Sequence, residues 1–145
     1  LIALPPGTGD VQLTLVQKCE LDGAIIISTP QDIALLDAKK AMQMFYKLDV
    51  PILGMVENMS THICRKCGHE EPLFGSGGVK TEASKTKVDF LGEIPLDIKV
   101  RESSDQGKPI VLTDFHCSQS NAFVEIADQL AKKLGLKYDQ GKLVT

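Results

Sequence analysis

Two cysteines spaced two residues apart, Cys64 and Cys67, are the residues of this sequence best suited to chemistry. Gly68 follows the pair and permits the positive φ angle that a tight metal-binding knuckle usually needs, so both sulfurs can face one metal ion. A tetrahedral thiolate site needs four ligands, and this stretch supplies two. On spacing alone, half of a structural zinc site is the commonest interpretation, with His62 and His69 either as further ligands or as exposed loop residues.

The chemistry of the pair depends on its surroundings. A thioredoxin-like redox role is the weakest interpretation, because the pair lies in a predicted loop and not at a helix N-terminus that would lower a thiol pKa. The four cysteines show no dense paired pattern, which indicates a reducing compartment. Cys19 ends a predicted helix, where we expect a small buried hydrophobic residue.

Composition limits the classes of function. The 145 residues are 43% hydrophobic, enough for one ordinary α/β core. A net charge of −3 argues against a nucleic-acid partner bound through phosphate neutralisation. No apolar run is long enough to cross a bilayer, so we expect no membrane partner.

The elements that must position the cysteines alternate between strands and helices. Apolar runs predict buried strands of a parallel sheet at 23–28, 51–57 and 89–94. Leu1–Leu4 reads as a further short strand before a rigid Pro-Gly loop. Thr29 is expected to cap the next helix, whose inward face comprises Leu35, Ala38, Met42 and Phe45. Further helices are expected at 11–18, 79–87 and 99–104, with a final helix stopped by Gly135.

This alternation predicts one α/β domain over residues 1–136, with a parallel sheet and flanking helices. We expect the cysteine loop to span 59–74 and residues 137–145 to form a frayed tail. The helix at 79–87 has a thin apolar face, Val79 and Ala83, so we expect it to be solvated and mobile. Because the sequence opens without Met inside an apparent strand, we expect it to be the C-terminal part of something longer.

Five motifs stand in a fixed order along residues 1–112. They are Leu4-Pro5-Pro6-Gly7-Thr8-Gly9-Asp10, Ser28-Thr29-Pro30-Gln31-Asp32-Ile33-Ala34, Val56-Glu57-Asn58-Met59-Ser60, Cys64-x-x-Cys67 and Leu91-Gly92-Glu93-Ile94-Pro95-Leu96-Asp97. Together they resemble the Mrp/ApbC-type iron–sulfur cluster carrier ATPases, whose close relatives include the mitochondrial Ind-type proteins.

The resemblance implies a deviant P-loop NTPase fold that binds ATP with Mg²⁺ at the carboxyl edge of the sheet. It also implies a homodimer in which Cys64 and Cys67 of two subunits hold one labile [4Fe–4S] cluster and deliver it to apo-proteins. The family match favours iron–sulfur over zinc. The alternative is a structural zinc-binding dimer or a non-hydrolysing assembly protein. The expected compartment is the cytoplasm or, as in the Ind-type relatives, the mitochondrial matrix.

The resemblance also implies roles for four residues around a nucleotide. Gly7 lies in the loop that matches switch II, the γ-phosphate sensor. Asn58 matches an adenine-contacting asparagine, whose amide both donates and accepts hydrogen bonds. Pro95 and Asp97 match the segment that flanks adenine and ribose. As isolated residues, Asn58 could instead cap a turn, and Asp97 could cap the helix after it.

Residues 1–145 depart from the family pattern at two points. The glycine-rich phosphate loop with its lysines, which lies upstream of switch II in the family, is not among them. Ala3 stands where the family has an aspartate that orients Mg²⁺ or the attacking water. Because alanine can do neither, no catalytic residue is assigned. Either the first residues are altered or hydrolysis is dispensable.

Overall fold

Three parallel strands form the centre of the fold, as the apolar runs predict. They are β1 (Ala24–Ser28), β2 (Ile52–Ile63) and β4 (Phe90–Leu96), with β2 between the other two. The computed structural model describes every residue except 6, 8, 65, 140, 141 and 145. The predicted α/β fold with a parallel sheet and flanking helices is therefore confirmed, with one short antiparallel strand added at the end of β2.

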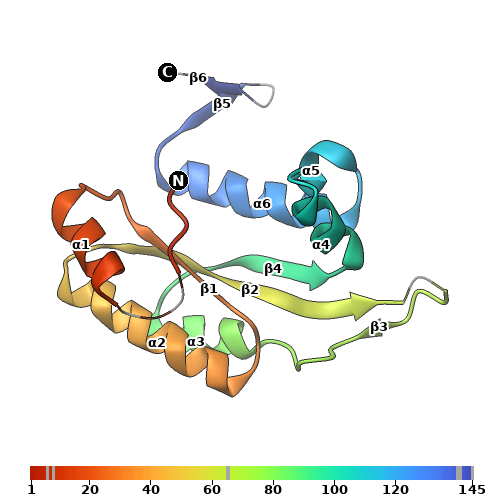
Figure 1. Ribbon diagram of the computed structural model, residues 1–145, viewed down its shortest axis with the longest axis horizontal. Coiled ribbons are helices and arrows are strands. Elements are labelled where there is room, and N and C mark those ends of the chain that lie inside the picture. The colour runs from red at the N-terminus through yellow and green to blue at the C-terminus, as the bar shows by residue number, and fades with distance from the viewer. Residues whose placement is uncertain (6, 8, 65, 140–141, 145) are drawn as a thin grey trace.

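Helices cover both faces of this sheet (Figure 1). One layer contains α1 (Asp10–Lys18), α2 (Asp32–Lys47) and α3 (Gly78–Thr86). The other contains α4 (Ile98–Asp105), the unpredicted short helix α5 (Ile110–Thr113), and α6 (Ser118–Lys133). Among the described residues, no helix is long and apolar enough to cross a membrane.

Each helical layer packs on its own apolar cluster. The cluster under α2 and α3 contains the four residues predicted to face inward, and all are buried: Leu35, Ala38, Met42 and Phe45. The cluster under α6 joins Val56 and Leu91 of the sheet to Ile126 of the helix. The central strand β2 is therefore buried from both sides.

Several local predictions near the N-terminus are wrong. Leu1–Leu4 forms no strand, because none of the described strands pairs with it and a lone extended segment has no ladder to stabilise it. Ile2 is exposed, and only Leu4 packs against the core. Cys19 is exposed, because it lies just past the end of α1. Thr29 does not cap α2; its hydroxyl bonds the Gln31 side chain instead.

Two later predictions also need correction. The helix α3 is firmly packed, because Val79 and Ala83 are 0% and 1% exposed against the sheet. The expected frayed tail contains a small antiparallel hairpin, β5 (Lys137–Asp139) and β6 (Lys142–Val144), whose backbones pair with each other.

Candidate metal centre

The cysteine segment is a β-hairpin and not the long loop predicted at 59–74. The strand β2 continues to Ile63, and β3 (Glu70–Glu71) pairs with its end in antiparallel register, with His62 opposite Glu71. The strand extends past Glu57 because its backbone groups find partners in β3 and β4. Residues 61–64 and 66–73, here called the cysteine hairpin, project beyond the body of the fold (Figure 1).

The tip of the cysteine hairpin is a tight, hydrogen-bonded turn. The Cys64 N–H donates to the His69 carbonyl, and the Gly68 N–H donates to the Cys64 carbonyl, both at 2.8 Å. Gly68 has a φ of +71°, a conformation that glycine adopts without steric cost. Cys67 is exposed and Cys64 is half-buried, so the turn presents the pair at the surface.

The turn also changes the acidity of one thiol. Backbone N–H groups of Cys67 and Lys66, followed by the Cys67 side chain, lower the pKa of Cys64 below its usual value, against a smaller opposing effect of burial. Hydrogen bonds to a charged form favour that form, so this sulfur is biased toward thiolate. The thiolate is the state of cysteine that ligates metals.

One chain supplies only two ligands at this tip. Among the described residues, no group of three or more His, Cys, Asp or Glu side chains is placed to hold a metal ion. His62 has its Nδ1 atom 3.4 Å from the Leu96 carbonyl oxygen, on the neighbouring strand. His69 is exposed, and its backbone carbonyl accepts the Cys64 N–H. The two histidines therefore do not complete a site with the cysteines.

Two of the four residues predicted around a nucleotide lie on adjacent strands. Asn58 lies within β2, opposite Ile94 of β4, and Pro95 follows Ile94 inside β4 instead of ending it. The Asn58 side chain is half-exposed, and its Oδ1 atom accepts the Met59 N–H at 3.0 Å. The amide therefore already holds the local backbone.

Asp97 takes the capping position that sequence alone also allowed. Its Oδ1 atom accepts the Lys99 N–H at 2.7 Å, at the start of α4. Its Oδ2 atom accepts a hydrogen bond from Gln119 of α6 at 3.2 Å. This carboxylate thus ties the end of β4 to two helices.

Gly7 lies in a loop of its own. It is exposed with a φ of +100°, and the buried Gln12 donates to the carbonyls of Pro5 at 2.9 Å and Gly7 at 3.2 Å. None of the described hydrogen bonds joins Gly7 to Asn58 or Asp97. Pro6 and Thr8 of the same motif lie outside the described residues.

One buried carboxylate near the site escaped prediction. Glu57 is 0% exposed, and its two oxygens accept the N–H groups of Gly77 and Val79, each at 2.9 Å. It therefore joins the central strand to the start of α3, across the base of the cysteine hairpin. An acid within an apolar strand run is the sequence signal that could have singled it out.

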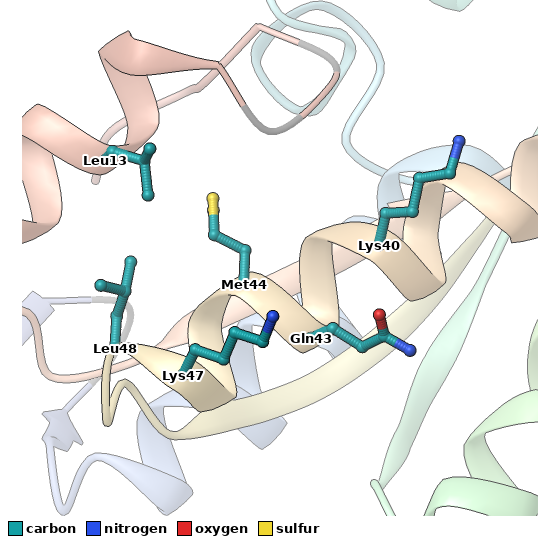
Figure 2. Close-up of a pocket in the computed structure, with 6 residues that line it drawn as sticks. All are labelled: Leu13, Lys40, Gln43, Met44, Lys47 and Leu48. Atoms are coloured by element: carbon teal, nitrogen blue, oxygen red, sulfur yellow. The ribbon is translucent and has the colours of Figure 1, made fainter.

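A separate hollow lies between α1 and α2, away from these residues (Figure 2). Its volume is about 390 Å³, and its lining is Leu13, Lys40, Gln43, Met44, Lys47 and Leu48. It contains no cysteine, carboxylate or other predicted site residue. The hollow is therefore not part of the candidate centre.

Comparisons with known proteins give consistent matches. Residues 1–131 match the family model described as ParA: NUBPL iron-transfer P-loop NTPase. An iron-sulfur cluster carrier protein of Salmonella typhimurium is 48% identical over 144 residues, which cover 99% of this chain and 38% of that protein. An iron-sulfur cluster carrier protein of Pyrococcus horikoshii is 51% identical over 143 residues, which cover 98% of this chain and 48% of that protein. The iron-sulfur cluster transfer protein NUBPL of Mus musculus is 44% identical over 134 residues, which cover 92% of this chain and 42% of that protein.

Solved structures match the fold. A nucleotide-binding protein of Archaeoglobus fulgidus in complex with ADP, with Co found in it, aligns with a TM-score of 0.67 and 38% identity over 80% of this chain and 46% of that one. The septum site-determining protein MinD of Pyrococcus horikoshii, complexed with Mg-ADP, aligns at 0.60 with 24% identity, which shows the fold alone. The chain spans less than half the length of the relatives it matches.

Proposed function

This chain belongs to the NUBPL iron-transfer P-loop NTPase family of ParA proteins, and on that premise we propose that it carries an iron–sulfur cluster for delivery to apo-proteins. Relatives of 44 to 51% identity bear the names of cluster carrier or cluster transfer proteins. Since the chain covers 38 to 48% of those relatives, the activity of a whole relative is part of the proposal.

The cargo in this proposal is a [4Fe–4S] cluster held by Cys64 and Cys67 of two copies of the chain. The observation that carries it is a pair of free thiols at the hairpin tip, Cys67 exposed and Cys64 half-buried, with no third ligand beside them among the described residues. A two-fold symmetric contact between two such tips would supply four thiolates without any further ligand. An exposed tip also suits a cargo that must be handed to another protein.

ATP with Mg²⁺ is the second proposed ligand, coupled to cluster handling. Asn58 and Pro95 would hold the base, because they lie on the adjacent strands β2 and β4, where Asn58 pairs with Ile94, the residue before Pro95. Asp97 would approach the ribose while capping α4, and Gly7 would respond to the γ-phosphate. Magnesium would neutralise phosphate charge when bound. We assign no hydrolytic residue, since Ala3 offers no group to orient water.

The proposal also includes a domain assignment and a cellular compartment. Residues 1–136 would be part of one P-loop NTPase-like domain, to which the cysteine hairpin is attached. The free thiols suit a reducing compartment, so we place the protein in the cytoplasm or, alternatively, the mitochondrial matrix.

Anaerobic reconstitution with iron and sulfide tests the proposal. The protein should become a brown dimer with a broad thiolate-to-iron absorbance, one cluster for each two chains. Cys64→Ser and Cys67→Ser should each abolish most of that absorbance. Cys19→Ser and Cys117→Ser are matched controls outside the cysteine hairpin and should change little. Unchanged absorbance in both hairpin variants would refute the assignment.

A structural zinc dimer is the second candidate. The hydrogen-bonded turn with Gly68 in the left-handed region is the geometry of a zinc knuckle as well. Metal and sulfide analysis of protein purified without oxygen separates the two candidates. Acid-labile sulfide with iron supports the carrier, whereas stoichiometric zinc that resists chelation, without sulfide, supports the structural dimer. Thiolates accept both metals, so metal found after aerobic purification decides little.

A further inference from the structure

The cysteine hairpin is held at its base by the buried side chain of Glu57 and by the pairing of His62 with Leu96 of β4. Glu57 lies on β2 just before the outgoing arm, and it accepts the N–H groups of Gly77 and Val79 just after the return arm, both at 2.9 Å. Twenty or more residues of chain are thereby closed into a loop by one carboxylate. Glu57 is fully buried, so no water competes for these bonds.

The outgoing arm bends at a strained position. Met59 has a φ of +57°, which side chains other than glycine rarely adopt. The pairing of β2 with β4 is also irregular here: Asn58 faces Ile94, and the next pair is His62 with Leu96. Between these two pairs, β2 advances by four residues and β4 by only two. Pro95 lies in this interval of β4 and has no N–H to donate to the ladder. Such bulges interrupt a ladder and bend the strand.

A buried hydroxyl lies at the same bend. The Oγ atom of Ser60 has no hydrogen-bond partner, although the residue is 1% exposed. An unsatisfied buried polar group destabilises the arrangement that contains it. The resting position of the outgoing arm is therefore under strain at two adjacent residues, which is typical of a segment with a second arrangement.

The return arm bends at glycines. Gly75 and Gly77 have φ values of +83° and +75°, and a Cβ atom at either position would meet nothing within 4 Å. A hollow of about 420 Å³ lies beside them, lined in part by Ser76 and Gly78. Gly75 therefore has both rotational freedom and room, whereas Gly77 is held by its N–H bond to Glu57 and by the Thr81 N–H, which its carbonyl accepts at 2.9 Å.

Between the two bends, the cysteine hairpin is internally bonded. His62 and Ile63 pair with β3, and the Thr61 hydroxyl donates to the Glu70 carboxylate at 2.8 Å. The turn closes with the Cys64 N–H bonded to the His69 carbonyl. These bonds do not cross either bend, so they can persist while the hairpin changes its direction. The pairing of His62 with Leu96 of β4, where His62 Nδ1 lies 3.4 Å from the Leu96 carbonyl oxygen, is the attachment that such a change would break.

We propose that the cysteine hairpin pivots as one unit about Met59 and Gly75–Gly77, and that Glu57 is the positioning residue that sets its resting direction. The purpose of the pivot rests on the proposed carrier function, because the direction of the hairpin decides whether two copies can bring their thiols onto one cluster. Glu57 touches neither cargo nor thiol, and it acts through the backbone at the hairpin base.

Residue-resolved amide hydrogen exchange on the metal-free chain, with cobalt(II) titration, tests the pivot. In Glu57→Gln, the side chain keeps one acceptor oxygen and gains an NH₂ group that cannot accept a hydrogen bond, so the amide of either Gly77 or Val79 should lose protection. The amides of Cys64 and Gly68 should keep theirs, since the unit stays intact. Cobalt–thiolate binding, read by charge-transfer absorbance, should weaken by about tenfold, as for other residues that orient metal ligands indirectly.

Glu82→Gln is the matched control. Glu82 is also buried on α3 and lines the hollow beside Gly77, but its carboxylate pairs with Lys39 of α2 at 3.0 Å. Because the described contacts give it no bond to the hairpin base, this change should leave all four amides and cobalt binding unaltered. Should Glu57→Gln fail to fold, Met59→Gly replaces it, since glycine relieves the strain and frees the same bend. It should keep core protection and weaken cobalt binding.

Three results would overturn the pivot: unchanged protection at Gly77 and Val79, protection lost equally at Cys64 and Gly68, or Met59→Gly with unaltered cobalt binding. Failure of the unaltered chain to bind cobalt through its thiols would count against the carrier function instead. The amide pattern of Glu57→Gln would still test the pivot in that case.

Discussion

The lowered pKa of Cys64 arises chiefly from backbone N–H groups of the described residues around it. The N–H groups of Cys67 and Lys66 are the largest causes of its lowered pKa. Their placement depends on the turn that Gly68 closes, so the effect belongs to the folded hairpin and not to the side chain of Lys66. Removing that lysine's charge should therefore leave the thiol nearly as acidic.

Alkylation by iodoacetamide across a range of pH measures this effect. Because the pKa of Cys64 is lowered in the folded chain, its thiolate forms at lower pH than in the unfolded chain. The midpoint of its rate profile should rise when the protein is unfolded in urea, and Lys66→Ala should hardly move the folded midpoint. Trypsin cleaves after Arg65 and after Lys66, so mass spectrometry separates Cys64 from Cys67. Coincident folded and unfolded midpoints would contradict the assigned cause.

The sequence was informative about individual residues wherever the signal is local. The spacing of Cys64 and Cys67 and the positive φ of Gly68 needed only neighbouring residues. The partners of Glu57 lie 20 and 22 residues away, and no local pattern identifies them. The capping role of Asp97 was one of two open alternatives, and only the contact with Lys99 decided that it caps.

At the scale of elements, backbone pairing between strands decides where a strand begins and ends more than the local amino-acid composition does. The polar residues after Glu57 predict that the third strand ends there, yet β2 runs to Ile63 because β3 and β4 satisfy its backbone. The type and order of the helices and buried strands followed from apolar periodicity. Leu1–Leu4 shows the converse, since an apolar run without a partner forms no strand.

The packing of α3 can be tested by truncating one side chain. Val79 is 0% exposed, so Val79→Ala should lower the free energy of unfolding by about 2 kcal/mol through lost burial and a residual cavity. Val11 of α1 is 63% exposed, so Val11→Ala should change the free energy of unfolding by less than about 0.5 kcal/mol. Urea titration of both variants gives the comparison. Equal small effects would mean that α3 is as loosely attached as its thin apolar face suggested.

At the scale of the whole molecule, the described chain presents an unpaired sheet edge. Among the described strands, β1 pairs only with β2, and Ile27 is 62% exposed on it. The strand therefore has backbone groups on its other edge that can pair with a further strand, including one of another copy. Residues 1–145 also contain no glycine-rich phosphate loop with its lysine.

A polypeptide of residues 1–145 should accordingly bind ATP no more tightly than millimolar and show no ATPase activity. In the proposed nucleotide site, Asn58 and Asp97 would supply base and ribose contacts, whereas the charge-assisted hydrogen bonds of a phosphate loop, each worth about 1.5–3 kcal/mol, are missing from residues 1–145. Titration calorimetry with Mg-ATP measures the affinity. Micromolar binding would show that the nucleotide site does not depend on such a loop.

The closure of the hairpin base by Glu57 has a consequence for how this surface can evolve. The carboxylate binds backbone N–H groups on the far side of the hairpin, and neither apolar cluster includes a described residue between Thr61 and Ser76. An insertion or deletion at the tip, beyond the paired residues of β2 and β3, should therefore act mainly through loop-closure entropy, about 0.6 kcal/mol for each doubling of length. New ligand chemistry can therefore be grafted onto the same scaffold while the sheet and its two helical layers stay unchanged.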